Sequence, residues 1–280
     1  MEGYLVTGGQ LERFVDGLRR EERSEGTVEK YRRDLAGFAA WLGDQRVCAG
    51  TAAEWKEHLL ASGLTPATVN SKLSALNGFF RAQGWSCRAK FVKVQRRVFR
   101  EQSRELHREE YSRLLSAARS RGRERLALLL ETICATGIRV SEVRYITVEA
   151  ARAGRTDVTL KGKVRTLLLP AKLCRKLLKY AKAQKTASGE IFVTKSGRGL
   201  SRGQIWQEMK SLCALAGVEP SKVFPHNLRH LFATVYYRAC RDIVKLADIL
   251  GHSSINTTRI YLQTTGAEHA RQLEQLRLVT

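Results

Sequence analysis

Residues 224–263 read FPHNLRHLFATVYYRACRDIVKLADILGHSSINTTRIYLQ, and this stretch decides the fold of the C-terminal half of the chain. Pro225 suits the first turn of a helix, where its missing N–H leaves no hydrogen bond unmade. His226, Arg229 and His230 follow at the spacing i, i+3, i+4, so all three project from one helical face. The same helix is expected to turn three apolar residues toward the core: Leu231, Val235 and Ala239.

Two shorter helices are expected next. The first stops at Gly251, because glycine accepts the left-handed conformation found at helix C-termini. His252 comes directly after that stop. A third helix, capped by Asn256 or Thr257, would carry Tyr261 one turn in.

The polar residues of this stretch indicate a site for an anion. Arginine and histidine donate hydrogen bonds to anions, and a tyrosine hydroxyl beside them can act as a nucleophile. A single histidine or tyrosine usually has a structural role only. Three polar residues on one helical face, followed by Gly-His and then a tyrosine, favour an anion site with a nucleophile nearby.

These residues also resemble the signature of a known family. In the tyrosine recombinase (phage-type integrase) family, the C-terminal pattern is His-x-x-Arg-His, then Leu-Gly-His, then a nucleophilic tyrosine nine residues later. Here His226, Arg229 and His230 match the first motif. His252 ends the second motif, and Tyr261 follows it by nine residues.

A second motif lies upstream. The string ATGIRVSE at residues 135–142 resembles the family's first-arginine motif and points to Arg139. Taken alone, Arg139 reads as a surface residue paired with Glu142 by helical spacing, and the resemblance reverses that preference. Asn227 departs from the family, in which many members carry Asp, and no role is expected for it. The resemblance covers nearly the whole chain and is most specific from residue 135 onward.

Composition agrees with a nucleic-acid-binding protein. The chain has 280 residues, and 49 Lys plus Arg against 27 Asp plus Glu give a net charge of +22, which favours a polyanionic partner. No apolar run approaches the length of a membrane span, and the N-terminus lacks a secretory signal pattern. Six scattered cysteines without a CxxC pair argue against zinc or a disulfide framework. We therefore expect a cytoplasmic, nucleoid-associated protein with no membrane contact.

The N-terminal part is expected to be a small helical bundle. Apolar residues recur at helical spacing in four segments between about residues 10 and 85. Thr27 is expected to cap the second helix, the box Thr51-Ala-Ala-Glu54 the third, and Thr65 before Pro66 the fourth. The bundle resembles the SAM-like core-binding domain of the family. The expected domains are 1–95 for the bundle, 96–106 for a basic linker along a phosphate backbone, and 107–280 for the catalytic domain with its C-terminal tail helix.

The second domain is expected to be α+β, so the whole chain is mainly α with a small antiparallel β-sheet. Two helices are expected before Gly137. Further along, the pattern predicts these elements: strands at 157–160 and 165–169, a helix at 171–185, a buried strand at 191–194, a helix from a capping box at Ser201 to about 216, and a last amphipathic helix at 267–278.

The family places a catalytic lysine in the turn of this hairpin, commonly within Gly-Lys-Gly. Here the turn, Lys161-Gly162-Lys163-Val164, is one residue shorter and reads Lys-Gly-Lys. Counting back from Pro170 favours Lys161, and counting forward from Arg139 favours Lys163. We prefer Lys161, because its Lys-Gly pair aligns best, and Lys163 is the alternative.

The resemblance implies roles for the two arginines and for the histidine of the second motif. Arg139 and Arg229 would clamp the non-bridging oxygens of a DNA phosphate, since arginine is always cationic and binds two oxygens at once. His252 would donate a hydrogen bond to the same phosphate. The sequence has no carboxylate or Cys/His cluster for a metal pair, so neither a metal nor a cofactor is expected.

The remaining residues would move protons and make the covalent bond. Tyr261 would attack the phosphorus to give a 3′-phosphotyrosyl link. His230 is the candidate base, with His226 beside it in contact with the phosphate. Lys161 would protonate the departing 5′ oxygen. The ester keeps the bond energy, so a 5′-hydroxyl of another strand can reverse the step.

The expected function is therefore site-specific recombination of double-stranded DNA, for integration or excision of a mobile element or for dimer resolution. The tail helix is expected to dock on the next subunit and form a homotetramer on paired sites, with a possible role for an accessory DNA-bending protein. One alternative is a type IB topoisomerase, which shares the chemistry but acts as a monomer. Another is a DNA-binding regulator without catalysis, which would form no covalent adduct.

Overall fold

The computed structural model describes residues 3–93, 104–160, 163–261 and 266–276. The chain divides into two compact units, Met1–Arg96 and Arg97–Thr280. Helices dominate both units, and one two-stranded antiparallel sheet lies in the second. The predicted fold class is confirmed. Within the described residues, no helix combines the length and the apolar character that crossing a bilayer requires.

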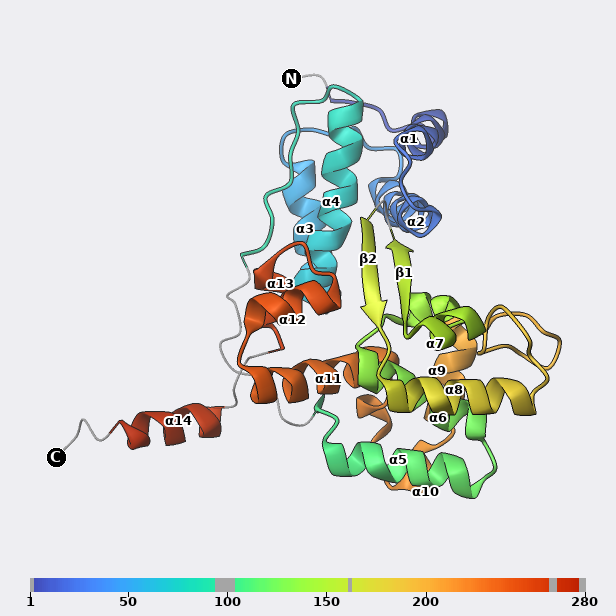
Figure 1. The fold of residues 1–280 in the computed structure, drawn as a ribbon. Helices are drawn as coiled ribbons and strands as arrows, with labels where there is room; N and C mark the ends of the chain where they lie inside the picture. The colour runs from blue at the N-terminus through green and yellow to red at the C-terminus, as the bar shows by residue number, and fades with distance from the viewer. Residues whose placement is uncertain (1–2, 94–103, 161–162, 262–265, 277–280) are drawn as a thin grey trace. The chain divides into compact units, whose positions relative to one another are not determined.

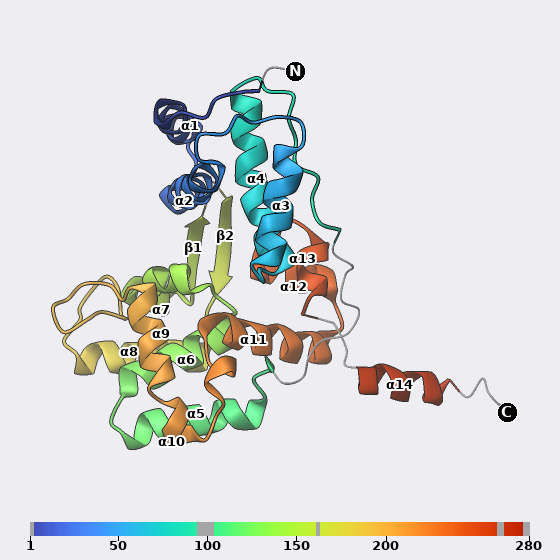
Figure 2. The same ribbon diagram turned by 180° about the vertical axis from the view of Figure 1, so that it is seen from behind.

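The first unit is the expected four-helix bundle (Figures 1 and 2). Its helices are α1 Gly8–Arg20, α2 Glu25–Leu42, α3 Thr51–Ala61 and α4 Pro66–Ala82. Their apolar faces meet in a core rich in aromatic rings, where Phe38 contacts both Trp55 and Phe80 edge-on at 5.7 and 6.0 Å between ring centroids. Such a core is large enough to hold a short bundle together.

The helix starts of this unit test the capping predictions. Thr65 caps α4 as predicted, by accepting a hydrogen bond from Thr68 N. The prediction for Thr27 is wrong, because α2 begins after Ser24 and the two hydroxyls bond each other at 2.9 Å. The capping box at Thr51 is also wrong. Thr51 is the first helical residue, and its hydroxyl accepts from Cys48 N at 2.9 Å, which takes it away from the helix.

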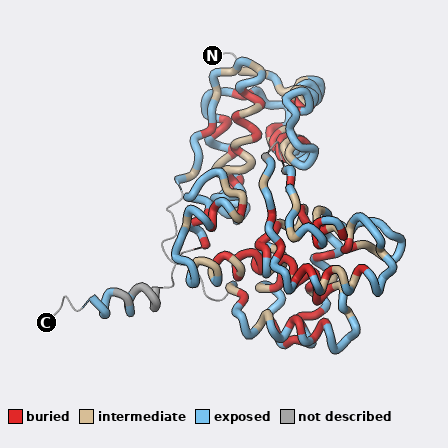
Figure 3. The backbone as a smooth tube through the Cα atoms, viewed as in Figure 1, coloured by how far each residue is buried: buried red, intermediate tan, exposed pale blue. Residues whose placement is uncertain are grey.

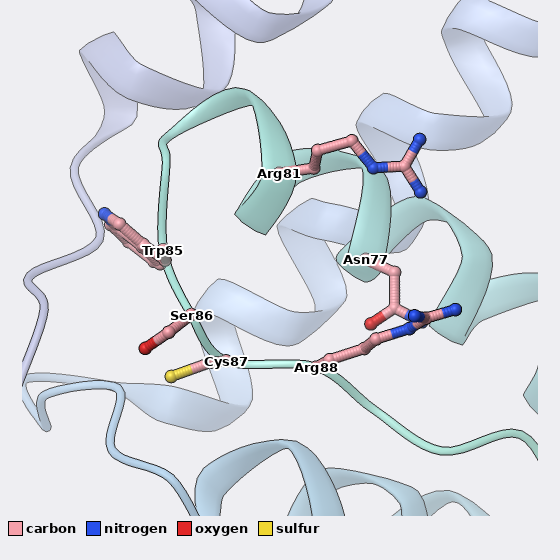
Figure 4. Close-up of a pocket in the computed structure, with 6 residues that line it drawn as sticks. All are labelled: Asn77, Arg81, Trp85, Ser86, Cys87 and Arg88. Atoms are coloured by element: carbon pink, nitrogen blue, oxygen red, sulfur yellow. The ribbon is translucent and has the colours of Figure 1, made fainter.

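Two asparagines attach the segment after α4 to the helix itself. Asn77 pairs with the backbone of Ala89 through Nδ2 to O at 3.0 Å and Oδ1 to N at 2.8 Å. Asn70 pairs with the backbone of Val92 in the same way, at 2.9 and 2.8 Å. The segment is thus fastened along α4 at two points. Next to the first point lies a pocket whose lining side chains come from α4 and from this segment (Figure 4): Asn77, Arg81, Trp85, Ser86, Cys87 and Arg88.

The second unit packs helices around a buried centre (Figures 1 and 3). Its elements are α5 Arg108–Ser120, α6 Glu124–Thr136, the 3₁₀ helix η2 Val140–Tyr145, α7 Val148–Ala153, β1 Arg155–Leu160, β2 Lys163–Leu168, α8 Ala171–Ala183, α9 Arg202–Lys210, α10 Cys213–Ala216, the 3₁₀ helix η3 Pro220–Lys222, α11 Pro225–Cys240, α12 Ile243–Leu250, α13 Ile255–Arg259 and α14 Gly266–Gln275. Helix α6 is buried along most of its length, as its near-continuous apolar sequence predicts.

The hairpin is longer than predicted. Strands β1 and β2 pair from Arg155 opposite Leu168 to Leu160 opposite Lys163. Lys163 and Val164 therefore belong to a strand, whereas the sequence pattern put them in the turn. Residues 161 and 162, which connect the strands, lie outside the described residues.

Two other predictions for this unit need correction. Residues 191–194, all of them described, form no strand, although Ile191 and Phe192 are buried as expected. The chain turns back there, with Thr194 N bonded to Arg198 O at 2.7 Å, so no partner strand extends beside it. The helix that Ser201 caps is broken after Lys210, where the Ser211 hydroxyl bonds the carbonyl of Glu208 and competes with the backbone.

Candidate active site

The site begins at the end of α6. Gly137 ends this helix in the left-handed conformation, with φ of +65°. A Cβ at this position would lie 2.4 Å from a ring carbon of Phe232 on α11 and 3.0 Å from Leu250 on α12. Only glycine therefore allows these helices to approach so closely while keeping the turn. Arg139 follows two residues later, at a point fixed by buried structure.

Arg139 is held by a carboxylate. Its backbone N–H donates to Glu142 Oε2 at 2.8 Å, and its guanidinium donates to Glu142 Oε1 at 3.0 Å. It also reaches the carbonyl of Gly251 at 3.4 Å. The pairing with Glu142 at helical spacing, predicted from the sequence alone, is present. Arg139 nevertheless lies at the centre of the site, as the resemblance to the family implies. About a third of its side chain is exposed.

Glu142 is fully buried and receives a second arginine, Arg165 of β2, at 2.6 Å. Burial by itself would raise the pKa of the Glu142 carboxyl. The hydrogen bond from Arg139 N–H and the positive charge of Arg165 outweigh burial and lower that pKa. Glu142 is therefore an ionised carboxylate at neutral pH and binds two guanidinium groups.

Arg229 of α11 is the most buried arginine of the site, with 2% of its surface exposed. Its terminal nitrogens donate to the carbonyls of Gly137 and Leu250, and one of them lies 2.9 Å from His252 Nε2. Burial and then the charge of Arg139 lower the pKa of its guanidinium, while the nearby Tyr261 opposes them. Arg229 thus joins the ends of α6 and α12 to His252.

His252 stands after Gly251, which ends α12 in the left-handed conformation as predicted. Its Nδ1 lies 2.8 Å from the hydroxyl of buried Thr258. Burial, followed by the charges of Arg229 and Arg139, lowers the pKa of His252 to about 4. The ring is therefore neutral at pH 7. Because Arg229 donates toward Nε2, we assign the remaining ring proton to Nδ1, which donates to Thr258.

Tyr261 lies among the histidines of the two motifs. The distances from its ring centroid are 4.9 Å to His230, 5.7 Å to His252 and 6.0 Å to His226. Only 3% of Tyr261 is exposed. His226 is exposed, and His230 is buried with Nδ1 3.3 Å from the hydroxyl of Thr234. The structure thus brings six of the seven candidate residues together within one chain: Arg139, His226, Arg229, His230, His252 and Tyr261.

The local prediction around Tyr261 was wrong in two details. Helix α13 is capped by Ser254 rather than by Asn256 or Thr257. It ends at Arg259, so Tyr261 lies just beyond the helix, with its N–H bonded to Thr258 O at 3.0 Å. Leu231 of α11 faces the core as expected. Val235 and Ala239 do not, because the helix extends past the core and its last turns are exposed.

Lys161, the preferred catalytic lysine, lies outside the described residues. Lys163 is the first residue of β2. The choice between them stays a prediction.

Comparison with known proteins decides the family. The model of the phage integrase family matches residues 104–268, and the model of the phage integrase N-terminal SAM-like domain matches residues 11–85. The chain belongs to the phage integrase family. It is 31% identical over 273 residues to the tyrosine recombinase XerA of Thermococcus kodakarensis, covering 95% of this chain and 94% of that protein. It is also 31% identical over 283 residues to the tyrosine recombinase XerD of Xanthomonas axonopodis pv. citri, covering 90% of this chain and 91% of that protein.

A solved structure shares the integrase fold. A λ integrase fragment in a crystal structure matches with a TM-score of 0.75 at 18% identity, covering 94% of this chain and 97% of that one. The family model and the relatives identify the chain as an enzyme of the tyrosine recombinase type.

The charges of the integrase site suit a phosphate. Its described side chains include three arginines, Arg139, Arg165 and Arg229, and one carboxylate, Glu142, which pairs with the first two, while His252 is neutral. Two positive charges are thus in excess. A phosphodiester carries one negative charge and gains a second when a nucleophile adds to phosphorus, so such a site stabilises the transition state more than the ground state. No group of three or more His, Cys, Asp or Glu residues that could hold a metal occurs in the described part of the chain.

Three residues of this site were missed by the sequence analysis: Glu142 as the shared carboxylate, Arg165, and Thr258 as the partner of His252. The motif string contained Glu142, and its spacing gave the pairing with Arg139. Arg165 had no such signal, because its partners lie 23 and 84 residues away.

Asn227, for which no role was expected, is buried. It donates to the carbonyls of Arg104 at 2.8 Å and Lys222 at 2.7 Å. It therefore fixes the start of α11, two residues before Arg229, to the chain that enters this unit.

Proposed function

We propose that this integrase is a site-specific DNA recombinase that cuts and rejoins strands through a covalent 3′-phosphotyrosine at Tyr261. One observation carries the proposal. The ring of the buried Tyr261 lies among three histidines of the same chain, and one of them, His252, is 2.9 Å from the guanidinium of Arg229. A nucleophile held beside a phosphate-binding cation needs little rearrangement to attack phosphorus.

Arg139 and Arg229 are the proposed phosphate clamps. A guanidinium carries five N–H donors, and the backbone carbonyls and His252 occupy three of those on Arg229. Arg139 keeps an exposed edge beyond its contact with Glu142. His252 Nε2 lies against Arg229, so a phosphate that replaces this contact would favour the neutral tautomer with the proton on Nε2, which then donates a hydrogen bond to the phosphate.

Proton transfer is assigned to the other motif residues. His230, edge-on to Tyr261, is the proposed base for the phenol, and His226 at the exposed rim contacts the phosphate. Lys161 is the proposed acid for the 5′ oxygen. These steps balance: the Tyr261 oxygen bonds to phosphorus, the bond from phosphorus to the 5′ oxygen breaks, and that oxygen takes the proton from the lysine.

The partner in this proposal is double-stranded DNA. Structures of related recombinases include XerH bound to its difH substrate and λ integrase bound to a core site. The net charge of +22 favours a phosphate backbone. We assign core binding to residues 1–95 and catalysis to 107–280, with the basic linker 96–106 along the DNA. Residues 96–103 of this linker lie outside the described residues.

The proposed assembly is a homotetramer on paired sites. The apolar residues of the tail helix are exposed, with Leu273 at 54% and Leu276 at 58%, and its predicted end at 277–278 lies outside the described residues. Four exposed apolar residues on α11, α12 and α13 and the connection after them offer a surface for such a tail: Val235, Val244, Ile255 and Ile260. Docking each tail on the next subunit would cover both surfaces in a closed ring.

The test is a search for the covalent bond. The protein is incubated with nicked duplexes of randomised sequence, in which a short cleaved fragment diffuses away and traps the adduct. We expect a protein–DNA adduct that survives denaturation, with the DNA linked through its 3′ end to Tyr261 in peptide mapping. The recovered sequences give the half-site. A link through another residue, or no adduct from any sequence, contradicts the proposal.

The adduct separates an enzyme from a DNA-binding regulator without catalysis, and a second assay separates the two enzymes. A type IB topoisomerase relaxes supercoiled DNA that carries one site, whereas a recombinase forms exchanged product only from DNA with two sites. The similarity to XerA and XerD does not favour the topoisomerase.

A further inference from the structure

We infer that Arg165 is a positioning residue of this integrase, which sets Arg139 and the turn before His252 without itself touching DNA. The inference rests on the proposed function, because it concerns how the proposed phosphate ligands are placed. Arg165 lies on β2 opposite Val158, outside the sequence motifs of the site.

The first observation is a closed ring of contacts. Arg165 donates to Glu142 Oε2 at 2.6 Å, and Glu142 accepts from Arg139 at 2.8 and 3.0 Å. Arg139 reaches the carbonyl of Gly251 at 3.4 Å. The other terminal nitrogen of Arg165 donates to the carbonyl of Ile249. Arg165 therefore holds both the carboxylate that orients Arg139 and the end of α12 from which His252 emerges.

The second observation is steric. Gly251 has φ of +63°, and a Cβ there would lie 2.4 Å from Arg165 Cδ and 2.8 Å from its Nε. The aliphatic part of Arg165 thus packs directly on the backbone of this turn. Gly251 is required twice, for its backbone conformation and for the close approach of Arg165.

The third observation separates Arg165 from the phosphate clamps. Both of its terminal nitrogens donate to protein groups, and its Nε is buried away from solvent with no hydrogen-bond partner in the described structure. Its side chain is 14% exposed, against 34% for Arg139. The hydrogen-bonding groups of Arg165 therefore face the protein, whereas Arg139 keeps an exposed edge.

Loss of Arg165 would leave Glu142 with one partner in place of two. The carboxylate would then be free to turn toward Arg139 alone, and the α12 end would lose its contact at Ile249. We expect Arg139 to be misplaced for the phosphate, which lowers the rate of cleavage. DNA binding depends on many phosphate contacts over a large surface and should change little.

The experiment compares Arg165→Lys and Arg165→Gln with the matched changes Arg155→Lys and Arg155→Gln. Arg155 lies on the same hairpin, at the far end of β1, and is exposed. The substrate is the nicked half-site recovered with the wild-type protein. It is used as the normal phosphodiester and as a methylphosphonate at the scissile position, where a methyl group replaces one charged oxygen. Adduct formation at saturating protein gives the rate constant, and gel shift gives the Kd.

We expect both Arg165 variants to lose about 10- to 100-fold in rate on the phosphodiester, less than the loss from removing a direct phosphate ligand. On the methylphosphonate the loss relative to wild type should shrink to a few-fold, because a neutral phosphorus centre needs less from Arg139. The Kd should stay within about twofold, and the Arg155 variants should match wild type on both substrates. Circular dichroism and thermal melting identify a variant that has lost its fold, and Arg165→Lys, which keeps the charge, is the decisive variant.

Several outcomes would overturn the inference. Wild-type rates for Arg165→Lys and Arg165→Gln would show that the ring of contacts does not matter. An equal loss on both substrates would indicate general destabilisation, and a Kd weakened with the rate would make Arg165 a direct DNA contact. If the wild-type protein forms no adduct, both the proposed function and this inference are contradicted. If the wild-type protein cleaves and the Arg165 variants do so equally well, only the inference is contradicted.

Discussion

The ring of Tyr261 lies edge-on to the ring of His230, with 4.9 Å between centroids and 67° between the ring planes. Both residues are buried and belong to the same chain. The proposed nucleophile and its proposed base are therefore adjacent in a single subunit without DNA. Strand cleavage then requires the substrate phosphate to enter between Tyr261 and the arginines.

Replacing Tyr261 by Phe should abolish cleavage and preserve binding. The substitution removes only the hydroxyl, so the ring still packs against His230 and His252. The variant should shift the half-site in a gel with the wild-type Kd. It should form no covalent adduct on the nicked duplex, and an adduct from this variant would assign the nucleophile elsewhere.

Arg139→Ala should lower the rate of adduct formation by about 10²–10³-fold, or about 3–4 kcal/mol, as removal of a preorganised donor to a developing oxyanion does. Because about a third of the Arg139 side chain is exposed, a large loss of stability is not expected. Single-turnover rates and the Kd on the same duplex test this. A near wild-type rate would remove Arg139 from the phosphate clamp.

Arg229→Ala should be costly in two ways. It removes a phosphate ligand, and it leaves the carbonyls of Gly137 and Leu250 buried without their donor, at about 1–3 kcal/mol for each. We expect both a rate loss like that of Arg139→Ala and a lower Tm, whereas Arg139→Ala affects mainly the rate. Thermal melting beside the cleavage assay would show the difference, and equal Tm values for the two variants would contradict the buried role of Arg229.

The stability of the protein should fall as the pH drops from 7 toward 5. The pKa of His252 is lowered to about 4 in the folded state from an ordinary value of 6.5, so the unfolded chain takes up the proton first. The stability contributed by the neutral ring is complete above pH 6.5 and decreases as pH falls through the window down to about 4. The lowered pKa of Glu142 acts in the same direction but below its ordinary value of 4.5. Tm measured from pH 7 to pH 5 should therefore fall less in His252→Gln than in wild type, and equal slopes would contradict this.

The general acid can be identified with a 5′-bridging phosphorothiolate at the scissile position. Sulfur leaves without a proton, so a variant that lacks only the acid should recover cleavage on this substrate. We expect recovery for Lys161→Ala. Recovery for Lys163→Ala and not for Lys161→Ala would exchange the two assignments.

Removing the tail after Gly266 should leave binding to one half-site intact and prevent assembly on paired sites. The exposed Leu273 and Leu276 would no longer be present to dock on a neighbour. Sedimentation with paired sites should give a tetramer for the full chain and smaller complexes for the truncated one. A normal tetramer with normal recombination would show that the tail packs on its own subunit.

The sequence alone allowed prediction of those parts of the site that depend on local spacing. His226, Arg229 and His230 share a helical face whatever surrounds the helix, and Gly137 and Gly251 mark helix ends because few other residues accept a left-handed backbone. These features are present in the structure as the sequence analysis expected.

Long-range contacts and competing local bonds were not predictable. Arg165 contacts Glu142 only after the hairpin packs against η2, and no periodic pattern in the sequence predicts a contact between residues so far apart. Thr51 and Thr27 show the second limit, since each hydroxyl bonds another partner and neither caps its helix. Buried Ile191 and Phe192 looked like a strand because burial and a short apolar run do not reveal whether a neighbouring strand exists.

Asn70 and Asn77 of the first unit also determine how long the free connection between the two units is. Helix α4 ends at Ala82, yet Asn70 still fastens the chain to it at Val92. Ten residues after the helix therefore add nothing to the reach of the connection, which is counted from Lys93 onward. If the contacts of Asn70 and Asn77 were broken, these ten residues would join the free connection. At about 3.3–3.6 Å per extended residue, they would add about 35 Å to its maximum length. Asn70 and Asn77 thus limit how far apart the bundle and the catalytic unit can bind on one DNA molecule.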